Sequence, residues 1–159
     1  MKAIYSKNET ETIELAKKLA KLVKPGMTIL LLGDLGAGKT TFTKGIGEGL
    51  GIQRIIKSPT YTIVREYMDG SLPLYHIDLY RLEEEDVANL ALDEYFNGEG
   101  LSVVEWPSVS PDDLPAEVLE ISLERDLDDL NLRTIRMKAK GSHYEELLAE
   151  FENHYFKND

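Results

Sequence analysis

The residues with the clearest chemical potential form one short segment, Gly33 to Thr41, with the letters GDLGAGKTT. It fits G-x-x-x-x-G-K-[ST], a pattern in which glycines let the backbone approach a phosphate closely. The loop N–H groups and the N-terminus of a following helix attract the anion, the lysine bridges the β- and γ-phosphates, and the threonine hydroxyl coordinates Mg²⁺. The sequence therefore predicts a site for a nucleoside triphosphate, formed by Gly33, Asp34, Leu35, Gly36, Ala37, Gly38, Lys39, Thr40 and Thr41.

A phosphate-binding loop of this kind needs acidic partners to hold Mg²⁺ and to orient the attacking nucleophile. Asp78 and Glu105 each stand at the end of a predicted strand. Either could bind the metal or position the water. We favour Glu105 as the metal ligand, since an apolar strand that runs directly into an acid is the more common arrangement. Asp78 is then the candidate for water positioning or for a switch. The alternatives are a helix cap for Asp78 and a surface acid for Glu105.

Thr60 follows a Ser-Pro pair and is the candidate for contact with the γ-phosphate or its metal, as in switch loops that order around a triphosphate. The alternative is that Thr60 is only a strand-forming residue that follows a proline. His76 is more typical of a half-buried strand residue than of a base, and Trp106 is more typical of packing than of stacking on a partner. Arg81 could be a catalytic cation or an ion-pair partner of the acidic residues 83–86.

A strand and a helix must position the loop. Residues 27–32 are a short apolar run that predicts a buried strand entering the loop, and residues 41–50 can continue as a helix. Residues 2–6 predict a short edge strand. Residues 8–23 predict a helix with acids near its start and lysines near its end, which a Pro-Gly pair terminates.

The rest of the chain predicts further elements of both kinds. Strands are predicted at 61–67, 72–80, 101–104, 118–123 and 132–139, the first two as a hairpin or as neighbours. Helices are predicted at 81–96 and 142–156, with a loop at 108–115. This order predicts an α/β fold, a P-loop NTPase-like three-layer arrangement with a central mixed sheet flanked by helices and antiparallel C-terminal strands. Residues 1–159 are expected to form a single domain.

Composition excludes several classes of function. The sequence has no cysteine, which rules out disulfides, thiolate zinc sites and a cysteine nucleophile. No apolar run has the length of a membrane span and the N-terminus lacks a signal-peptide core, so we expect a cytoplasmic protein without a membrane partner. The net charge of −11 divides into +6 for residues 1–65 and −17 for residues 66–159. This acidic balance argues against broad, charge-driven binding of nucleic acid by the chain alone.

The segments GDLGAGKTT, SPTYT, HIDLYRL, LDEYF and VEWP, in this order and spacing, resemble the bacterial TsaE family, also called YjeE or YdiB. The resemblance covers nearly the whole chain. It implies a small P-loop ATPase needed for the threonylcarbamoyl modification of adenosine 37 in tRNAs that read codons beginning with A. It also implies partnership with a TsaB–TsaD pair, which transfers the threonylcarbamoyl group made by a TsaC-type synthase and stimulates an otherwise weak ATP hydrolysis.

The same resemblance implies roles for individual residues. The P-loop would bind the phosphates and Thr40 the Mg²⁺, with Glu105 as the Walker B acid and Asp78 as a second essential acid. The other matched positions are Thr60 in the switch-like segment, Trp106 after the acid, Glu9, Glu11 and Thr12 at a helix start beside the nucleotide, and Arg133 on its other side. Contact with tRNA would be indirect, through the complex.

Two other functions stay open. A small-molecule P-loop kinase shares the loop, but the six arginines form no obvious lid cluster of the kind that clamps a transferred phosphoryl group. The second open function is a switch that binds nucleotide with little hydrolysis. The N/T-K-x-D element typical of guanine specificity is not evident, which favours adenine mildly.

Overall fold

The structure is a computed structural model and describes residues 3–156. Within this range, seven strands form one sheet: β1 (Ile4–Ser6), β2 (Thr28–Leu32), β3 (Val64–Tyr67), β4 (Leu74–Asp78), β5 (Leu101–Glu105), β6 (Val118–Arg125) and β7 (Arg133–Lys140). Their order across the sheet is β1-β7-β6-β2-β5-β4-β3. The four central strands β6, β2, β5 and β4 are parallel, and β7, β1 and β3 add at the sides in antiparallel pairing. The predicted mixed sheet with antiparallel C-terminal strands is therefore confirmed.

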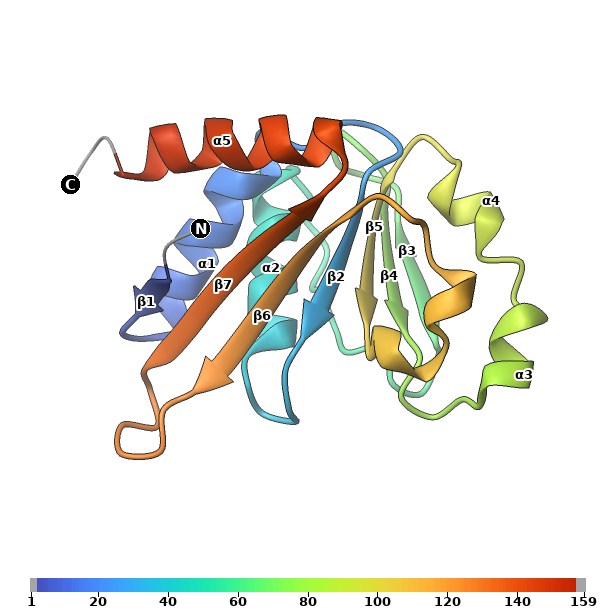
Figure 1. The fold of residues 1–159 in the computed structure, drawn as a ribbon, viewed down its shortest axis with the longest axis horizontal. Helices are drawn as coiled ribbons and strands as arrows, with labels where there is room; N and C mark the ends of the chain where they lie inside the picture. The colour runs from blue at the N-terminus through green and yellow to red at the C-terminus, as the bar shows by residue number, and fades with distance from the viewer. Residues whose placement is uncertain (1–2, 157–159) are drawn as a thin grey trace.

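Helices cover both faces of the sheet, as Figure 1 shows. The elements are α1 (Glu9–Ala20), α2 (Lys39–Gly49), α3 (Glu84–Ala88), α4 (Asp93–Phe96), α5 (Ser142–Phe156) and the 3₁₀ turns Pro107–Val109 and Pro111–Asp113. Helices α1 and α2 pack on one face, α5 lies along the end of the sheet opposite the P-loop, and α3 and α4 lie on the other face (Figure 1). The predicted α/β, P-loop NTPase-like three-layer fold is confirmed.

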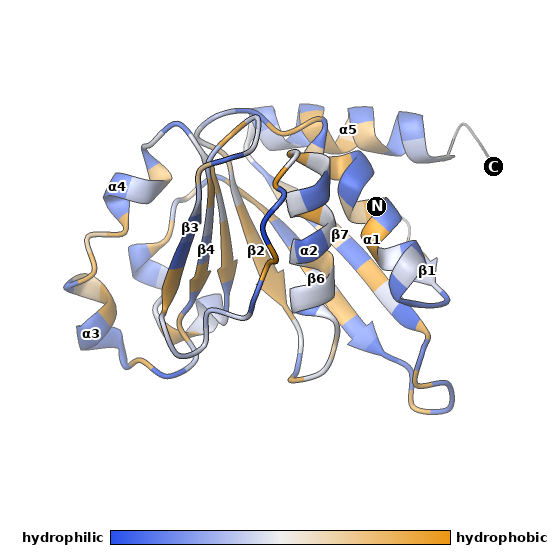
Figure 2. Ribbon diagram, turned by 180° about the vertical axis from the view of Figure 1, so that it is seen from behind, coloured by the Kyte–Doolittle hydropathy of each residue, from blue (hydrophilic) through white to orange (hydrophobic). Residues whose placement is uncertain are grey.

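Two apolar clusters hold the layers together, one on each face of the sheet. In β2 the side chains alternate, so that Ile29 and Leu31 face α1 and α2 while Leu30 faces Val87 and the second layer. Strands β2 and β5, at the centre of the sheet, are mostly apolar, whereas β6 and β7 alternate between apolar and polar residues (Figure 2). This difference follows from burial, because β2 and β5 are covered on both faces, whereas β6 and β7 present one face to solvent.

Helices α1 and α2 approach each other unusually closely. Gly45 and Gly49, one turn apart on α2, lie against the backbone of α1. A Cβ on Gly45 would lie 2.6 Å from both the carbonyl oxygen of Ile13 and the Cβ of Ala16. A Cβ on Gly49 would lie 2.6 Å from the Cβ of Ala20. The two glycines therefore set the distance between the P-loop helix and its neighbour.

The prediction of one helix over residues 81–96 is wrong. Two short helices, α3 and α4, occupy this range, and Ala91 between them has φ of 53°, in the left-handed region. Such a φ is incompatible with a continuous helix. No glycine or proline marks the break in the sequence. Tertiary packing causes the break, because Val87, Leu92 and Phe96 all pack into the same apolar cluster over β4 and β5.

The other predicted elements are confirmed with adjusted ends. Helix α1 ends at Ala20 rather than residue 23, and the hairpin β3–β4 begins at Val64 because residues 61–63 form a turn. The predicted edge strand 2–6 is β1; its first residue lies outside the described residues, as do residues 157–159 of the predicted domain. Among residues 3–156, no helix is long and apolar enough to cross a membrane.

Candidate functional site

The predicted P-loop connects β2 to α2 at the carboxyl edge of the parallel strands, the lower edge of the sheet in Figure 1. Gly36 and Gly38 have φ of 80° and 105°, a region that residues with a Cβ rarely adopt. Gly33 is needed for space, since a Cβ there would lie 2.6 Å from the carbonyl oxygen of Leu123. Gly38 is the N-cap of α2 and offers no side-chain cap. The first N–H groups of α2 are thus not satisfied by a cap side chain, which suits an anion.

Lys39 places a buried ammonium group in the site. The residue is 5% exposed, and its Nζ lies 3.8 Å from the ring centroid of Trp106. Among the described residues, Nζ has no hydrogen-bond partner. Burial lowers the pKa of Lys39 below 10.5, and the negative charges of Glu105, Asp78 and Asp34 oppose that shift. The site therefore holds a cation that lacks an acceptor, as expected for a lysine whose partner is a ligand.

The two predicted acids stand side by side. Asp78 and Glu105 are register partners on the adjacent parallel strands β4 and β5. They are 3% and 4% exposed, and both line the same pocket as Lys39 and Thr40. Paired burial of this kind is costly unless the charges have partners. The arrangement brings two acids, one cation and one hydroxyl residue together at the mouth of the loop.

Asp78 is already engaged by groups of the chain itself. Its Oδ2 accepts a hydrogen bond of 2.9 Å from the hydroxyl of Thr60, and its Oδ1 accepts one of 2.9 Å from the backbone N–H of Tyr80. Thr60 also exchanges a hydrogen bond with Ser58. The helix-cap alternative for Asp78 does not hold, because Glu83 is the N-cap of α3. Thr60 is linked to the acid that we predicted for water positioning.

Two further walls close the pocket, which has a volume of about 390 Å³. One wall is the start of α1, where Asn8, Glu9 and Thr12 line the pocket and Asn8 caps the helix through Glu11 N–H. The other is Arg133, at the start of β7. Its Nε donates to the carbonyl oxygen of Ala37 at 2.8 Å and its Nη2 to that of Gly36 at 3.3 Å. Arg133 thereby ties β7 to the P-loop.

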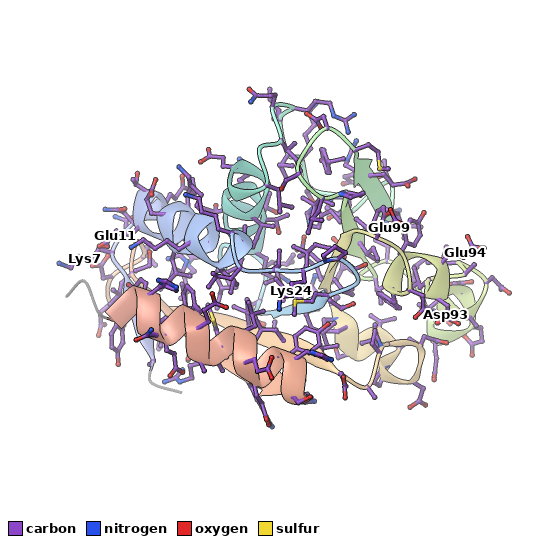
Figure 3. All side chains as sticks on the ribbon, turned by 90° about the horizontal axis from the view of Figure 1, so that it is seen from above. Lys7, Glu11, Lys24, Asp93, Glu94 and Glu99 are labelled. Carbon is purple, nitrogen blue, oxygen red and sulfur yellow. The ribbon has the colours of Figure 1, made fainter. Side chains whose placement is uncertain are left out.

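Most predicted site residues meet in this pocket, and a few do not. Of those predicted, the pocket is lined by Leu35, Gly36, Gly38, Lys39, Thr40, Thr41, Thr60, Asp78, Glu105, Glu9, Thr12 and Arg133. Gly33, Asp34 and Ala37 line a second hollow on the other side of the loop. Glu11 does not line the pocket: its carboxylate accepts a hydrogen bond from Lys7 N–H, and both residues lie at the outer end of the molecule (Figure 3).

The pocket also contains residues that sequence reasoning did not include. These are Asn8, Ser58, Tyr80 and Asn131. Ser58 and Tyr80 stand two residues from Thr60 and Asp78, so proximity in the sequence was an available signal. Asn8 was recognisable as a helix cap, a position that faces the pocket only because α1 packs beside α2. Asn131 lies in the β6–β7 turn, where nothing local marks it.

Two aromatic contacts define the surroundings of the acids. The ring of Trp106 packs against that of Tyr80, with centroids 4.8 Å apart, and so contacts both Tyr80 and Lys39. Its packing role is thus realised inside the site, not away from it. The guanidinium of Arg81 lies 5.0 Å from the ring centroid of Tyr61, which is 84% exposed.

The residues present fit Mg²⁺–nucleotide without forming a metal site of their own. Within the described residues, no group of three or more His, Cys, Asp or Glu side chains could hold a metal ion. Mg²⁺ is usually bound by one or two carboxylates together with substrate phosphates and water. Glu105 and Thr40 can supply the protein ligands, and the unpartnered Nζ of Lys39 can receive a phosphate oxygen.

A P-loop between β2 and α2, with two acids at the ends of neighbouring parallel strands, defines the class: an α/β protein with a P-loop NTPase-like fold. A family model described as "Threonylcarbamoyl adenosine biosynthesis protein TsaE" matches residues 6–135. The chain belongs to the TsaE family, and the resemblance found in the sequence is confirmed.

Individual relatives agree over nearly full length. A Bacillus subtilis protein named tRNA threonylcarbamoyladenosine biosynthesis protein TsaE is 52% identical over 147 residues, which cover 92% of this chain and 91% of that protein. A Haemophilus influenzae protein of the same name is 32% identical over 155 residues, covering 94% and 96%. The crystal structure of Bacillus subtilis YdiB matches with a TM-score of 0.85 and 47% identity over 96% of this chain and 95% of that one.

Proposed function

We propose that this chain binds ATP with Mg²⁺ in the P-loop pocket and hydrolyses it in the cytoplasm. The hydrolysis serves the threonylcarbamoyl modification of adenosine 37 in tRNAs that read codons starting with A. The chain acts there with a TsaB–TsaD-type protein pair that stimulates its weak activity. Membership of the TsaE family supports the pathway, because the matching relatives are named for threonylcarbamoyladenosine biosynthesis.

One observation carries the nucleotide part of the proposal. The ammonium of Lys39 is buried at the P-loop beside two acids and has no hydrogen-bond acceptor within the described chain. Leaving a buried charge unpaired costs several kcal/mol in general, so a protein retains such a group where a ligand satisfies it. A phosphate chain carries the acceptors and the negative charge that this lysine lacks.

The chain's residues divide the work of hydrolysis. The P-loop N–H groups and Lys39 hold the phosphates, and Thr40 with Glu105 holds Mg²⁺, which neutralises charge on the phosphate oxygens. Asp78 orients the attacking water. Its two oxygens already accept hydrogen bonds from Thr60 and Tyr80, which fixes the carboxylate and favours water positioning over direct metal binding.

The negative net charge of the chain supports contact with tRNA through the partner pair rather than directly. Residues 66–159 carry a net charge of −17, and the whole chain carries −11. Binding to a nucleic acid depends mainly on neutralising its phosphates with Lys and Arg. We therefore expect no tight binding of free tRNA at physiological salt, with tRNA held by the partner pair. Nanomolar binding of free tRNA by this chain would contradict that division of labour.

The decisive experiment measures phosphate release from ATP by the purified protein, alone and with a purified TsaB–TsaD pair. Lys39→Ala is the control. The proposal requires slow release alone, strong stimulation by the pair and loss of both in the control. ATP binding without phosphate release in either case would leave a nucleotide switch. A phosphorylated small molecule among the products would reveal a kinase instead.

A kinase is the weaker candidate. Arg133 is the one arginine among the residues that line the pocket, and its guanidinium already donates to carbonyl oxygens of the P-loop. Phosphoryl-transfer enzymes commonly use mobile cations to clamp the transferred group. A guanidinium tied to backbone oxygens can form the wall of the pocket but is poorly suited to such a clamp.

A further inference from the structure

His76 is a buried polar side chain that the proposed hydrolysis does not use. It lies in the middle of β4 and is 0% exposed. Its Nε2 is 2.5 Å from Oε2 of Glu105, and both side chains are buried. Its Nδ1 has no hydrogen-bond partner among the described residues. Within residues 3–156 the imidazole therefore has a single polar contact, and that contact is the acid that we assign to Mg²⁺.

Sheet register explains why the two side chains meet. On β4 and β5, His76 pairs with Val103, and Asp78 pairs with Glu105. Side chains two residues apart on a strand share a face, so His76 and Asp78 point the same way, and Glu105 faces that way from β5. His76 and Glu105 are diagonal neighbours, a separation that an imidazole and a glutamate can span. The contact is thus built into the register of the two central strands.

The chemistry of the pair sets the direction of the hydrogen bond. An ionised carboxylate only accepts hydrogen bonds, so the ring must carry its proton on Nε2. That donor occupies one oxygen of Glu105 and leaves the other for the pocket, which Glu105 lines. A carboxylate with one oxygen fixed loses most of its rotational freedom. In metal sites, partners of this kind orient the ligand and tune its basicity.

We infer that His76 is a positioning residue: by donating from Nε2 to Oε2 it holds the Glu105 carboxylate in the orientation that binds the Mg²⁺ of the nucleotide. Asp78 is held in a parallel way by Thr60 and Tyr80. Each acid thus has its own support: Glu105 is held by a residue within β4, and Asp78 by Thr60, in the segment before β3, and by Tyr80, just after β4. The inference rests on the proposed nucleotide site and deepens it.

Three variants separate positioning from packing. His76→Leu removes the donor, His76→Gln retains an N–H donor on a side chain of similar reach, and Ile77→Val removes a methylene from the opposite face of the same strand. Loss of a partner that orients a metal ligand typically costs about 10–100-fold in metal affinity or activity. We expect His76→Leu to lower kcat by about that factor and to raise the Mg²⁺ concentration needed for half-maximal rate, with KM for ATP at saturating Mg²⁺ little changed. His76→Gln should recover most of the loss, and Ile77→Val should resemble the parent protein.

The Mg²⁺ dependence of ATP affinity is the second readout, followed through the fluorescence of Trp106, the only tryptophan in the sequence. It works even for a protein that binds ATP without hydrolysing it. If the parent protein binds no nucleotide, the proposed function fails. If it binds MgATP and His76→Leu keeps the parent's Mg²⁺ dependence, the positioning role alone is overturned. Equal losses in the Leu and Gln variants, in step with their melting temperatures, would also overturn it.

A spectroscopic test needs no ligand. ¹⁵N NMR of the imidazole rings distinguishes a proton on Nε2 from one on Nδ1, and His76→Gln assigns the signal among the three histidines. The positioning role requires the Nε2–H form in the free protein, with slow exchange of that proton. A predominant Nδ1–H form would remove the donor that holds Glu105 and would refute the inference.

Discussion

Asp78 and Glu105 face each other across β4 and β5 as register partners, yet the chain holds them by different means. Asp78 accepts two hydrogen bonds from loop groups, and Glu105 accepts one from a buried imidazole. Two acids at the same level of a sheet can therefore have separate functions. Their hydrogen bonds, rather than their positions, distinguish them.

Asp78→Asn should lower kcat by about 10²-fold or more with the Mg²⁺ requirement unchanged, because it removes the group that we propose to orient the attacking water. Glu105→Gln should raise the Mg²⁺ requirement, because an amide is a weaker ligand. Phosphate release measured over a range of Mg²⁺ concentrations, with the partner pair present, separates the two effects. The reverse pattern would exchange the two assignments.

Lys39→Met should stabilise the free protein while abolishing ATP binding. The variant keeps the apolar stem and removes a charge whose desolvation exceeds its attraction to Glu105, Asp78 and Asp34, and we expect that gain to exceed the lost contact with Trp106. We expect a gain on the order of 1 kcal/mol in the free energy of unfolding at pH 7, measured by urea denaturation. Lys44→Met on the exposed side of α2 is the control and should be close to neutral.

The Lys39 pKa also gives this gain a pH dependence. Burial lowers the folded pKa below 10.5, so between the two values the unfolded chain binds more protons than the folded one. Unfolding free energy contributed by Lys39 therefore rises with pH in that window. The advantage of Lys39→Met should shrink as pH approaches 10.5. A constant difference between the variants from pH 7 to 10.5 would contradict a lowered pKa.

Gly45→Ala should destabilise the protein by about 1–3 kcal/mol, since the new methyl group would overlap backbone atoms of α1 that cannot yield easily. Gly47→Ala is the matched control on the same helix. A Cβ there would lie 3.0 Å from Cγ1 and 3.1 Å from Cδ1 of Ile56, side-chain atoms that can move more easily than backbone, and alanine is the better helix former by about 1 kcal/mol. Thermal unfolding of both variants tests the contrast, and equal losses would argue against the close helix contact.

Tyr144→Phe should cost about 1–3 kcal/mol, because the Tyr144 hydroxyl accepts a buried hydrogen bond of 2.8 Å from the N–H of Thr28. That bond fastens α5 to the first residue of β2, and the N–H would be left unsatisfied. Burial raises the pKa of Tyr144, so the hydroxyl stays protonated in the folded state. Tyr5→Phe, at a residue 63% exposed, is the control. Denaturant midpoints of the two variants should differ clearly.

Local patterns in the sequence were sufficient for some of these features. The apolar run 27–32 entering a glycine-rich loop specified β2, the P-loop and α2, because strand, loop and helix are contiguous. The two acids were recognisable because each ends a strand. The helix break at Ala91 was not recognisable from the sequence. The surrounding apolar cluster imposes it, and residues 81–96 contain no glycine or proline.

Features that depend on register or on distant segments could not be read in this way. His76 and Glu105 are 29 residues apart, and their contact exists only because β4 pairs with β5 in one register. Arg133 donates hydrogen bonds to the carbonyl oxygens of Ala37 and Gly36, which lie 96 and 97 residues earlier in the sequence. Sequence reasoning suggested a half-buried strand residue for His76, and the structure buries it completely.

The close contact of α1 with α2 has a consequence for how ligands are received. Asn8 at the start of α1 and Lys39 at the start of α2 line one pocket, and two glycines fix the spacing of their helices. This side of the pocket is preorganised, so a ligand that touches both helices loses little entropy in assembling it. The same geometry limits sequence change on α2, because a Cβ at Gly45 or Gly49 would lie 2.6 Å from the Cβ of Ala16 or Ala20. The lack of a Cβ at Gly45 and Gly49 therefore both preorganises the ligand pocket and restricts which substitutions these two positions can accept.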